Sequence, residues 1–117
     1  MKRAEVSMHG MPAGILEEIE AGKKYRFAYF ERYNGPSIAL TMPVDRKEFV
    51  FERFPPFFDG LLPEGLLLEG LLKQRKIDKF DYLSQLIAVG NDLVGAVTVQ
   101  EKNLNIKETN EPLSDYI

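Results

Sequence analysis

The fold is decided by residues 3–30, which read RAEVSMHGMPAGILEEIEAGKKYRFAYF. The first apolar residues of this stretch alternate with polar ones, which is the period-two pattern of a strand with one buried face. These apolar residues are Ala4, Val6 and Met8. The turn sequence HGMP at residues 9–12 then precedes a short second strand at Ile15 and Leu16. The two strands are therefore predicted to form a hairpin.

Three more strands are predicted downstream of a break at residues 21–23. The third strand has alternating aromatic side chains that suit a pleated, half-buried surface, namely Tyr25, Phe27 and Tyr29. A fourth strand is expected over residues 37–42, and it stops at Pro43, which has no N–H to donate. Its predicted buried face carries Ile38, Leu40 and Met42. The run from Glu48 to Glu52 is predicted to be a fifth strand at the sheet edge.

Helices are expected to follow from residue 54. The prolines in FPPFF, residues 54–58, suit the first turn of a short helix. Pro63 is expected to begin a second helix, with Glu64 at its positive end and basic residues at its negative end. The basic residues are Lys73, Arg75 and Lys76, and the predicted apolar stripe consists of Leu67, Leu68, Leu71 and Leu72. Gly65 and Gly70 in this helix suggest close packing.

The last predicted elements are a third helix and a closing strand. Asp78 is expected to be the N-cap of the helix, and Gly90 its left-handed stop. Residues 93–100 are expected to return to strand, with Gly95 permitting a close backbone approach. The sequence thus predicts a single α+β domain over residues 1–100, with a mainly antiparallel sheet of four to six strands and two to three helices. Residues 101–117 are predicted to be a polar C-terminal tail.

Composition narrows the classes of function. The 117 residues include no cysteine, which excludes disulfides and thiolate metal sites, and the net charge of −3 argues against direct binding of nucleic acid. No signal peptide or membrane span is expected, and a cytoplasmic location is weakly favoured. His9, the single histidine, is expected on a solvated turn, and no phosphate-binding glycine loop is present. We therefore expect neither a catalytic site, nor a cofactor, nor a metal.

A concentration of aromatic, proline and leucine residues between Phe54 and Pro63 has two interpretations. Its apolar area is larger than one short helix readily buries on one side, which favours a partner-binding surface. The alternative, at least as well supported by the sequence, is that these residues cap the sheet as part of the core. Both roles can coexist on one helix.

Three motifs resemble the N-terminal subdomain of HipA-type kinases. The sequence FFDGLLPEG at residues 57–65 is similar to that subdomain's FF-(D/E)-N-LLP-(D/E) motif, with Gly60 in place of the usual Asn. The strand-like SIALTMP at residues 37–43 resembles its LSLSLP segment. FDYLSQL at residues 80–86, followed by GNDLVGAVT at 90–98, resembles its closing segment. Because the order and spacing of all three agree, the signal is specific.

The resemblance implies a function through a kinase. HipA-type proteins join this subdomain to a serine/threonine kinase body, whereas this sequence stops where that body is expected to begin. The likeness therefore extends to split systems of HipB, HipS and HipT, in which a free-standing HipS-like antitoxin inhibits a HipT-like kinase toxin in trans. The rival is an N-terminal fragment of a fused HipA toxin. A helix-turn-helix HipB-like protein is an implied third partner, without direct nucleic-acid or membrane contact by this chain.

The resemblance also implies which residues bind the kinase. The predicted partner-binding residues lie in the central motif and are Phe57, Phe58, Leu61, Leu62, Pro63 and Glu64. The chain has no tryptophan, so an apolar wedge at a kinase cleft has to come from Phe57, Phe58 or another group.

Overall fold

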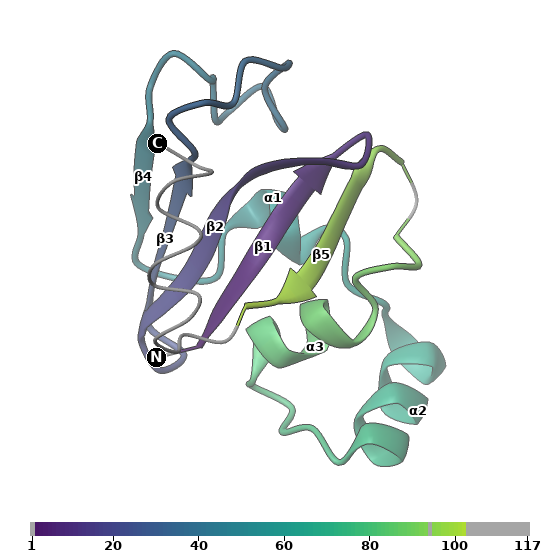
Figure 1. Cartoon of the computed structure of the whole chain (residues 1–117). Coiled ribbons are helices and arrows are strands. Elements are labelled where there is room, and N and C mark those ends of the chain that lie inside the picture. The colour runs from purple at the N-terminus through teal and green to yellow at the C-terminus, as the bar shows by residue number, and fades with distance from the viewer. Residues whose placement is uncertain (1, 94, 103–117) are drawn as a thin grey trace.

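A computed structural model of the chain describes residues 2–93 and 95–102. These residues form one five-stranded antiparallel sheet, in the order β4-β3-β2-β1-β5, with three helices (Figure 1). The elements are β1 (Arg3–Met8), β2 (Met11–Glu20), β3 (Lys24–Tyr29), β4 (Glu48–Phe51), α1 (Pro56–Asp59), α2 (Gly65–Arg75), α3 (Tyr82–Ala88) and β5 (Val97–Glu101). The prediction of a single α+β domain with an antiparallel sheet is confirmed.

The predicted hairpin forms, and its second strand is longer than the apolar pattern indicated. His9 and Gly10 make the connection between β1 and β2 with φ angles of 51° and 79°. Positive φ at both central residues gives the turn a twist that matches the flanking strands. The register then shifts at Val6/Ser7, so Ser7 pairs with Pro12. Continuation of β2 to Glu20 places it against both β1 and β3.

The fourth predicted strand is wrong. Residues 37–43 form a tight turn instead, with the Met42 N–H donating to the Ala39 carbonyl at 3.1 Å. Ile38 and Met42 are buried, but Leu40 is fully exposed. Apolar residues do alternate along this segment, but the chain reverses direction within it. It does so because residues on both sides of the turn, Ile38 and Met42, hydrogen-bond to the hydroxyl of Tyr29. The predicted edge strand after this turn is confirmed as β4, which pairs with β3 alone among the strands.

The core lies between the sheet and the helices. Tyr25, Phe27 and Tyr29 of β3 point to this face and are buried, as predicted. α1, which lies behind the sheet in Figure 1, places Phe58 against Phe27 with ring centroids 6.0 Å apart. Pro56 occupies the first turn of α1, where a backbone N–H would have no acceptor within the helix, so proline's lack of an N–H does not weaken it. α3 packs against β5 and β1 and completes the core with Leu83 and Leu86.

The N-cap of α3 is Asp81, not Asp78 as predicted. The Asp81 carboxylate accepts the Ser84 N–H at 3.2 Å and the Lys2 amine at 2.9 Å. Burial opposes ionisation of Asp81, but the hydrogen bonds from Lys2 and Ser84 outweigh it and hold the pKa of this carboxyl below its ordinary value. Asp78 instead accepts the Phe80 N–H at 2.7 Å in the preceding turn. The sequence offers two aspartates at capping spacing, and the structure places the cap at Asp81.

Gly90 does not provide a left-handed stop for α3. Its φ is not positive, and it is buried where a Cβ atom would lie 1.7 Å from the Val99 carbonyl oxygen of β5. The close approach expected at Gly95 is also wrong, since this residue has φ 106° and, its chain neighbours aside, no described atom lies within 4 Å of where its Cβ would stand. The closing strand starts at Val97 and not at Leu93. Beyond Glu101 and Lys102, the predicted tail lies outside the described residues.

The sheet face opposite α1, called here the outer face, carries a row of ion pairs across four strands. The Glu17 carboxylate lies 3.2 Å from Arg3 and 2.8 Å from Arg26. Arg26 also pairs with Glu48 at the edge. Opposite charges that face each other on neighbouring strands stabilise this face of the sheet without the burial of a large apolar surface. The outer face is therefore chemically distinct from the apolar face toward the helices.

Candidate partner-binding surface

The central motif, residues 57–64, consists of the last residues of α1 and the turn that follows them. The Leu61 N–H donates to the Phe58 carbonyl at 3.0 Å, and the Leu62 N–H donates to the Asp59 carbonyl at 3.2 Å. These bonds satisfy the end of the short helix and fix the direction in which the next residues leave it. Gly60, the departure from the family motif, has φ −66° and is an ordinary helical C-cap.

The six predicted partner-binding residues differ in how far a partner can reach them. Phe58 is completely buried, with its ring 5.2 Å from that of Phe57. Phe58 can support a partner-binding surface from within the core, but a partner cannot contact its ring. Glu64 is exposed, and the remaining four are half-buried, namely Phe57, Leu61, Leu62 and Pro63. Both interpretations of the motif's composition therefore apply: Phe58 belongs to the core, and the other five residues form an accessible rim. Partner binding by these residues stays a prediction.

Helix α2 follows the motif and contributes no residue to the core. No member of its predicted leucine stripe is fully buried: Leu67 is 77% exposed, and Leu68, Leu71 and Leu72 are half-buried. Leu66, which lies outside the predicted stripe, is 85% exposed. The expectation of close packing at the glycines is wrong as well, since apart from the adjoining backbone no described atom lies within 4 Å of a Cβ built at Gly65 or Gly70. Gly65 instead supplies φ 59° where the chain enters the helix. α2 contacts α3, and its outward side is left without a partner in the described part of the chain.

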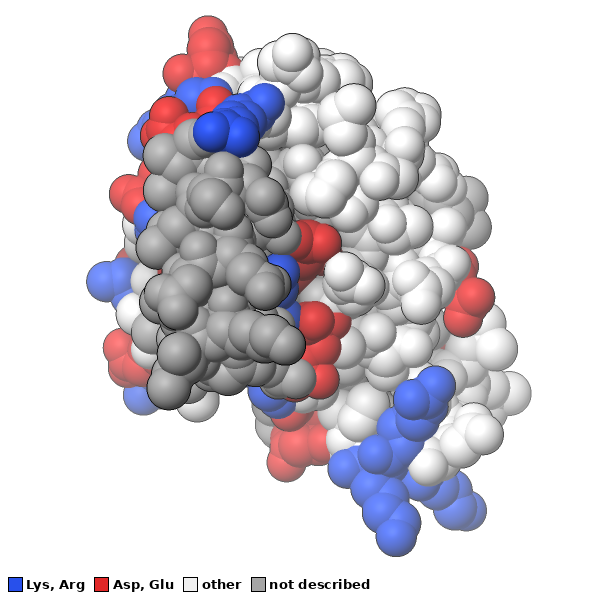
Figure 2. All heavy atoms as spheres, viewed as in Figure 1, with Lys and Arg blue, Asp and Glu red and all other residues white. Residues whose placement is uncertain are grey.

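The basic end of α2 matches the sequence prediction. Lys73 and Arg75 occupy the last turn, where positive charge favours the helix dipole, and Lys76 is a left-handed C-cap with φ 55°. Figure 2 shows a cluster of basic side chains at the lower end of the molecule, where Figure 1 shows α2. Exposed leucines and exposed cations thus lie on the same helix. The sequence analysis did not identify Leu66 as an exposed residue. The signal that could have identified it is its position directly after the glycine at which the chain enters the helix.

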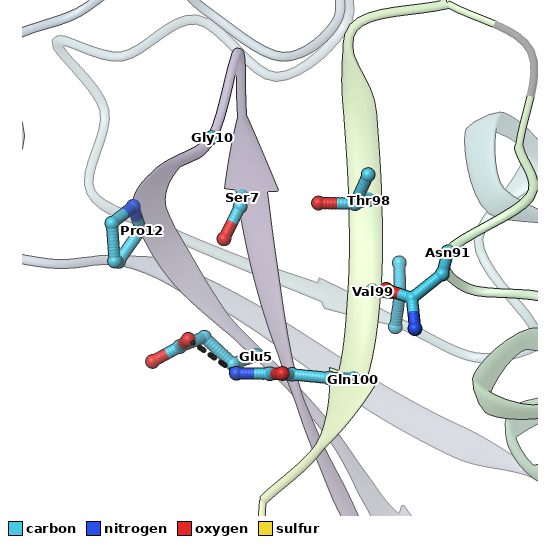
Figure 3. A pocket seen from close by; sticks show the side chains of 8 residues that line it. All are labelled: Glu5, Ser7, Gly10, Pro12, Asn91, Thr98, Val99 and Gln100. Atoms are coloured by element: carbon cyan, nitrogen blue, oxygen red, sulfur yellow. Dashed lines mark hydrogen bonds between the residues drawn. The ribbon is translucent and has the colours of Figure 1, made fainter.

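The outer face has a polar hollow of about 310 Å³ beside β1 and β5 (Figure 3). Ser7, Thr98 and Gln100 line it, together with Glu5. The Glu5 carboxylate accepts a hydrogen bond from the Gln100 amide at 3.1 Å and lies 3.7 Å from the Lys102 amine. These two contacts give the Glu5 carboxylate a structural role. Within residues 2–93 and 95–102, no three His, Cys, Asp or Glu side chains gather closely enough to hold a metal ion.

The fold and surface define a small α+β domain whose distinctive features are apolar side chains open to a partner. None of the described helices is long and apolar enough to cross a membrane. Residues 4–100 match the HipA N-terminal domain family, and the chain belongs to that family. The predicted likeness to the HipA N-terminal subdomain is thereby confirmed.

Individual relatives agree with this assignment. An uncharacterized protein of Haemophilus influenzae is 29% identical over 102 residues, which cover 87% of this chain and 94% of the relative. A candidate kinase of Sinorhizobium fredii, Y4dM, is 31% identical over 104 residues, which cover 81% of this chain but only a quarter of that protein. The solved N-terminal domain of HipA toxin superposes with a TM-score of 0.69 at 24% identity, over 90% of this chain and 96% of that one. This last likeness concerns the fold alone.

Proposed function

We propose that the chain is an antitoxin: a non-catalytic regulatory subunit that binds a HipT-like serine/threonine kinase toxin in trans and inhibits it in the cytoplasm. A HipB-like helix-turn-helix protein completes the complex. Membership of the HipA N-terminal domain family supports a kinase partner. The Haemophilus influenzae relative supports a subunit of this size, because a match to this domain accounts for 94% of that protein.

The observation that carries the proposal is the exposure of Leu66 and Leu67 directly after the central motif. Full burial of a leucine side chain contributes about 1.5–3 kcal/mol, and a rigid helix presents both residues with little further loss of conformational entropy. A kinase surface that covers them also reaches Glu64 and the half-buried rim of the motif. Binding there holds the kinase in an unproductive state.

A second candidate function is favoured by the Sinorhizobium fredii relative. The match covers a quarter of that protein, so the domain there is one part of a longer chain with a kinase name. If this sequence continues into a kinase body, the same surface packs against that body in cis. The full coding sequence and its neighbouring genes distinguish the two arrangements.

The inhibition is tested by combining the purified chain with the kinase encoded beside it and radiolabelled ATP. We expect a stable complex by size-exclusion chromatography and suppressed autophosphorylation of the kinase, in proportion to the chain added. Full phosphorylation in the presence of a stable complex would refute inhibition. Absence of any complex would refute the whole proposal.

The surface is tested by the double variant Leu66→Ala, Leu67→Ala. Because both side chains are exposed, the thermal midpoint of the free chain should stay within about 5 °C of the original, since each surface substitution usually changes stability by less than ~0.5 kcal/mol. Affinity for the kinase should fall about 30-fold or more. Val50→Ala is the matched control, because Val50 is half exposed but lies on the outer face opposite Arg26. Equal affinities of the double variant and the control would contradict this surface.

A further inference from the structure

Gly70 lies in the middle of α2, where the described fold gives no reason for a glycine. Its φ is not positive, so the backbone conformation does not require one. Apart from the adjoining backbone, no described atom lies within 4 Å of a Cβ built there, so packing does not require one either. Glycine inside a helix is destabilising relative to alanine, because it loses more conformational freedom on folding. The described part of the chain therefore gains no stability from this glycine.

Gly70 belongs to a row of exposed residues along the outward side of α2. With 3.6 residues per turn, positions i, i+4 and i+7 line up on one side of a helix. Leu66, Gly70 and Lys73 have this spacing, and all three are exposed. The three half-buried leucines of α2 lie on the other side of the helix. The row therefore has a leucine at one end, a cation at the other and, over Gly70, an open space that we call the notch.

The cation at the end of the row has no carboxylate to pair with in the part of the chain that the structure describes. Neither Lys73 nor Arg75 forms an ion pair there, whereas Lys2 and Arg26 do. Basic side chains gather at the end of the molecule where α2 lies, although the chain has a net charge of −3 (Figure 2). An acidic surface is the electrostatic complement of this end of the row.

The apolar end of the row favours a protein as the source of that acidic surface. Leu66 and Leu67 are the most exposed residues of the helix that offer apolar area. Their side chains have no donor for a phosphate oxygen, which is the group that supplies most protein contacts with nucleic acids. A protein surface can supply both an apolar pocket and a carboxylate. The row also begins two residues after Glu64, so a protein that covers the central motif reaches it directly.

We propose that Gly70 is a specificity-determining residue: the notch admits a part of the partner kinase that packs directly on the backbone of α2. On either side of this contact, the kinase has an apolar pocket for Leu66 and a carboxylate for Lys73. This rests on the proposed function and names the chemistry of the kinase surface that α2 meets. A position without a side chain lets another chain approach closely. The cost of glycine to the free helix is thus offset in the complex.

The first test compares Gly70→Ala and Gly70→Leu in the full chain. Alanine and leucine both favour helix, so the amide hydrogens of α2 should exchange about two- to fivefold more slowly in both variants than in the original chain. Affinity for the kinase, measured by calorimetry, should fall roughly three- to tenfold for alanine and about 30-fold or more for leucine, because the larger side chain overfills the notch. A better protected helix that binds more weakly is not expected from a merely structural role. Val50→Ala, on the outer face, should bind within about twofold of the original chain.

The outcomes separate this inference from the antitoxin role. If the original chain forms the complex and Gly70→Leu binds equally well, the notch is refuted while the antitoxin role stands. If the original chain forms no complex, both fail. Light scattering of the free chain covers the other occupant: if the original chain dimerises and Gly70→Leu does not, while kinase affinity is unchanged, a second copy fills the notch and the assignment to the kinase is overturned.

The second test concerns the carboxylate that faces Lys73. Lys73→Glu should weaken binding roughly five- to twentyfold at low salt, and the difference from the original chain should shrink as salt rises from about 50 to 500 mM, because salt screens exposed charges. Lys47→Glu is the matched control, because Lys47 is exposed directly before β4 and the change in net charge is identical. Equal effects of the two variants would show that only net charge matters and would overturn the acidic contact at Lys73.

Discussion

Gly90 gives the sharpest test of the fold, because the sequence and the structure assign it opposite roles. In Gly90→Ala the new Cβ would begin 1.7 Å from the Val99 carbonyl oxygen, whereas ordinary contact begins near 3.4 Å. β5 must therefore move by roughly 1.5 Å or more, since the obstruction is backbone. The movement breaks the bond from the Val99 N–H to the Gly90 carbonyl, now 3.0 Å, at a cost of about 1 kcal/mol. Crowding adds about 1–3 kcal/mol, for a total near 2–4 kcal/mol.

The assay is urea and thermal unfolding of the variant, followed by circular dichroism. A domain of this size should lose on the order of 10–25 °C in its midpoint. Gly90→Asn distinguishes a left-handed cap from a close backbone approach. A position with left-handed backbone tolerates Asn better than Ala, whereas a sterically crowded position tolerates Asn no better than Ala. Gly95→Ala serves as comparison, because there the strain is in the backbone and the space is open. A Gly90→Asn variant clearly more stable than Gly90→Ala would refute the close-approach reasoning.

Two further predictions concern stability. Phe58→Ala should cost about 3–5 kcal/mol, because the ring is fully buried against Phe27 and Phe57, and a denaturant midpoint close to the original would contradict its core role. Asp81→Asn keeps the cap but loses the pairing with Lys2; since the folded pKa of Asp81 is lowered, its contribution is present above the ordinary carboxyl pKa of about 3.9 and disappears as the pH falls through the lower folded value. Thermal midpoints of the two proteins should therefore differ at pH 6 and converge near pH 2, and a constant difference would exclude this linkage.

The candidate site was only partly predictable. Residues 57–65 were identified by their family motif, and the motif does stand beside accessible apolar surface. The sequence did not distinguish Phe57, which is half-buried, from Phe58, which is fully buried, because adjacent aromatics carry the same signal. The leucines of α2 show the converse error. Their spacing indicated a buried stripe, but burial needs an opposing surface, and α2 has no fully buried residue.

The sequence by itself determined the strands of the hairpin, β3 and β4, and the order of strands before helices. Alternation along one strand and turn residues between strands are local properties, so they can be read without knowledge of the partners. Tertiary structure alone decided two points at which the sequence prediction was wrong. The reversal at Leu40 depends on the hydroxyl of Tyr29, and the need for glycine at position 90 depends on the backbone of Val99. Each contact joins residues nine positions apart on different segments, and the pattern of either segment alone does not reveal it.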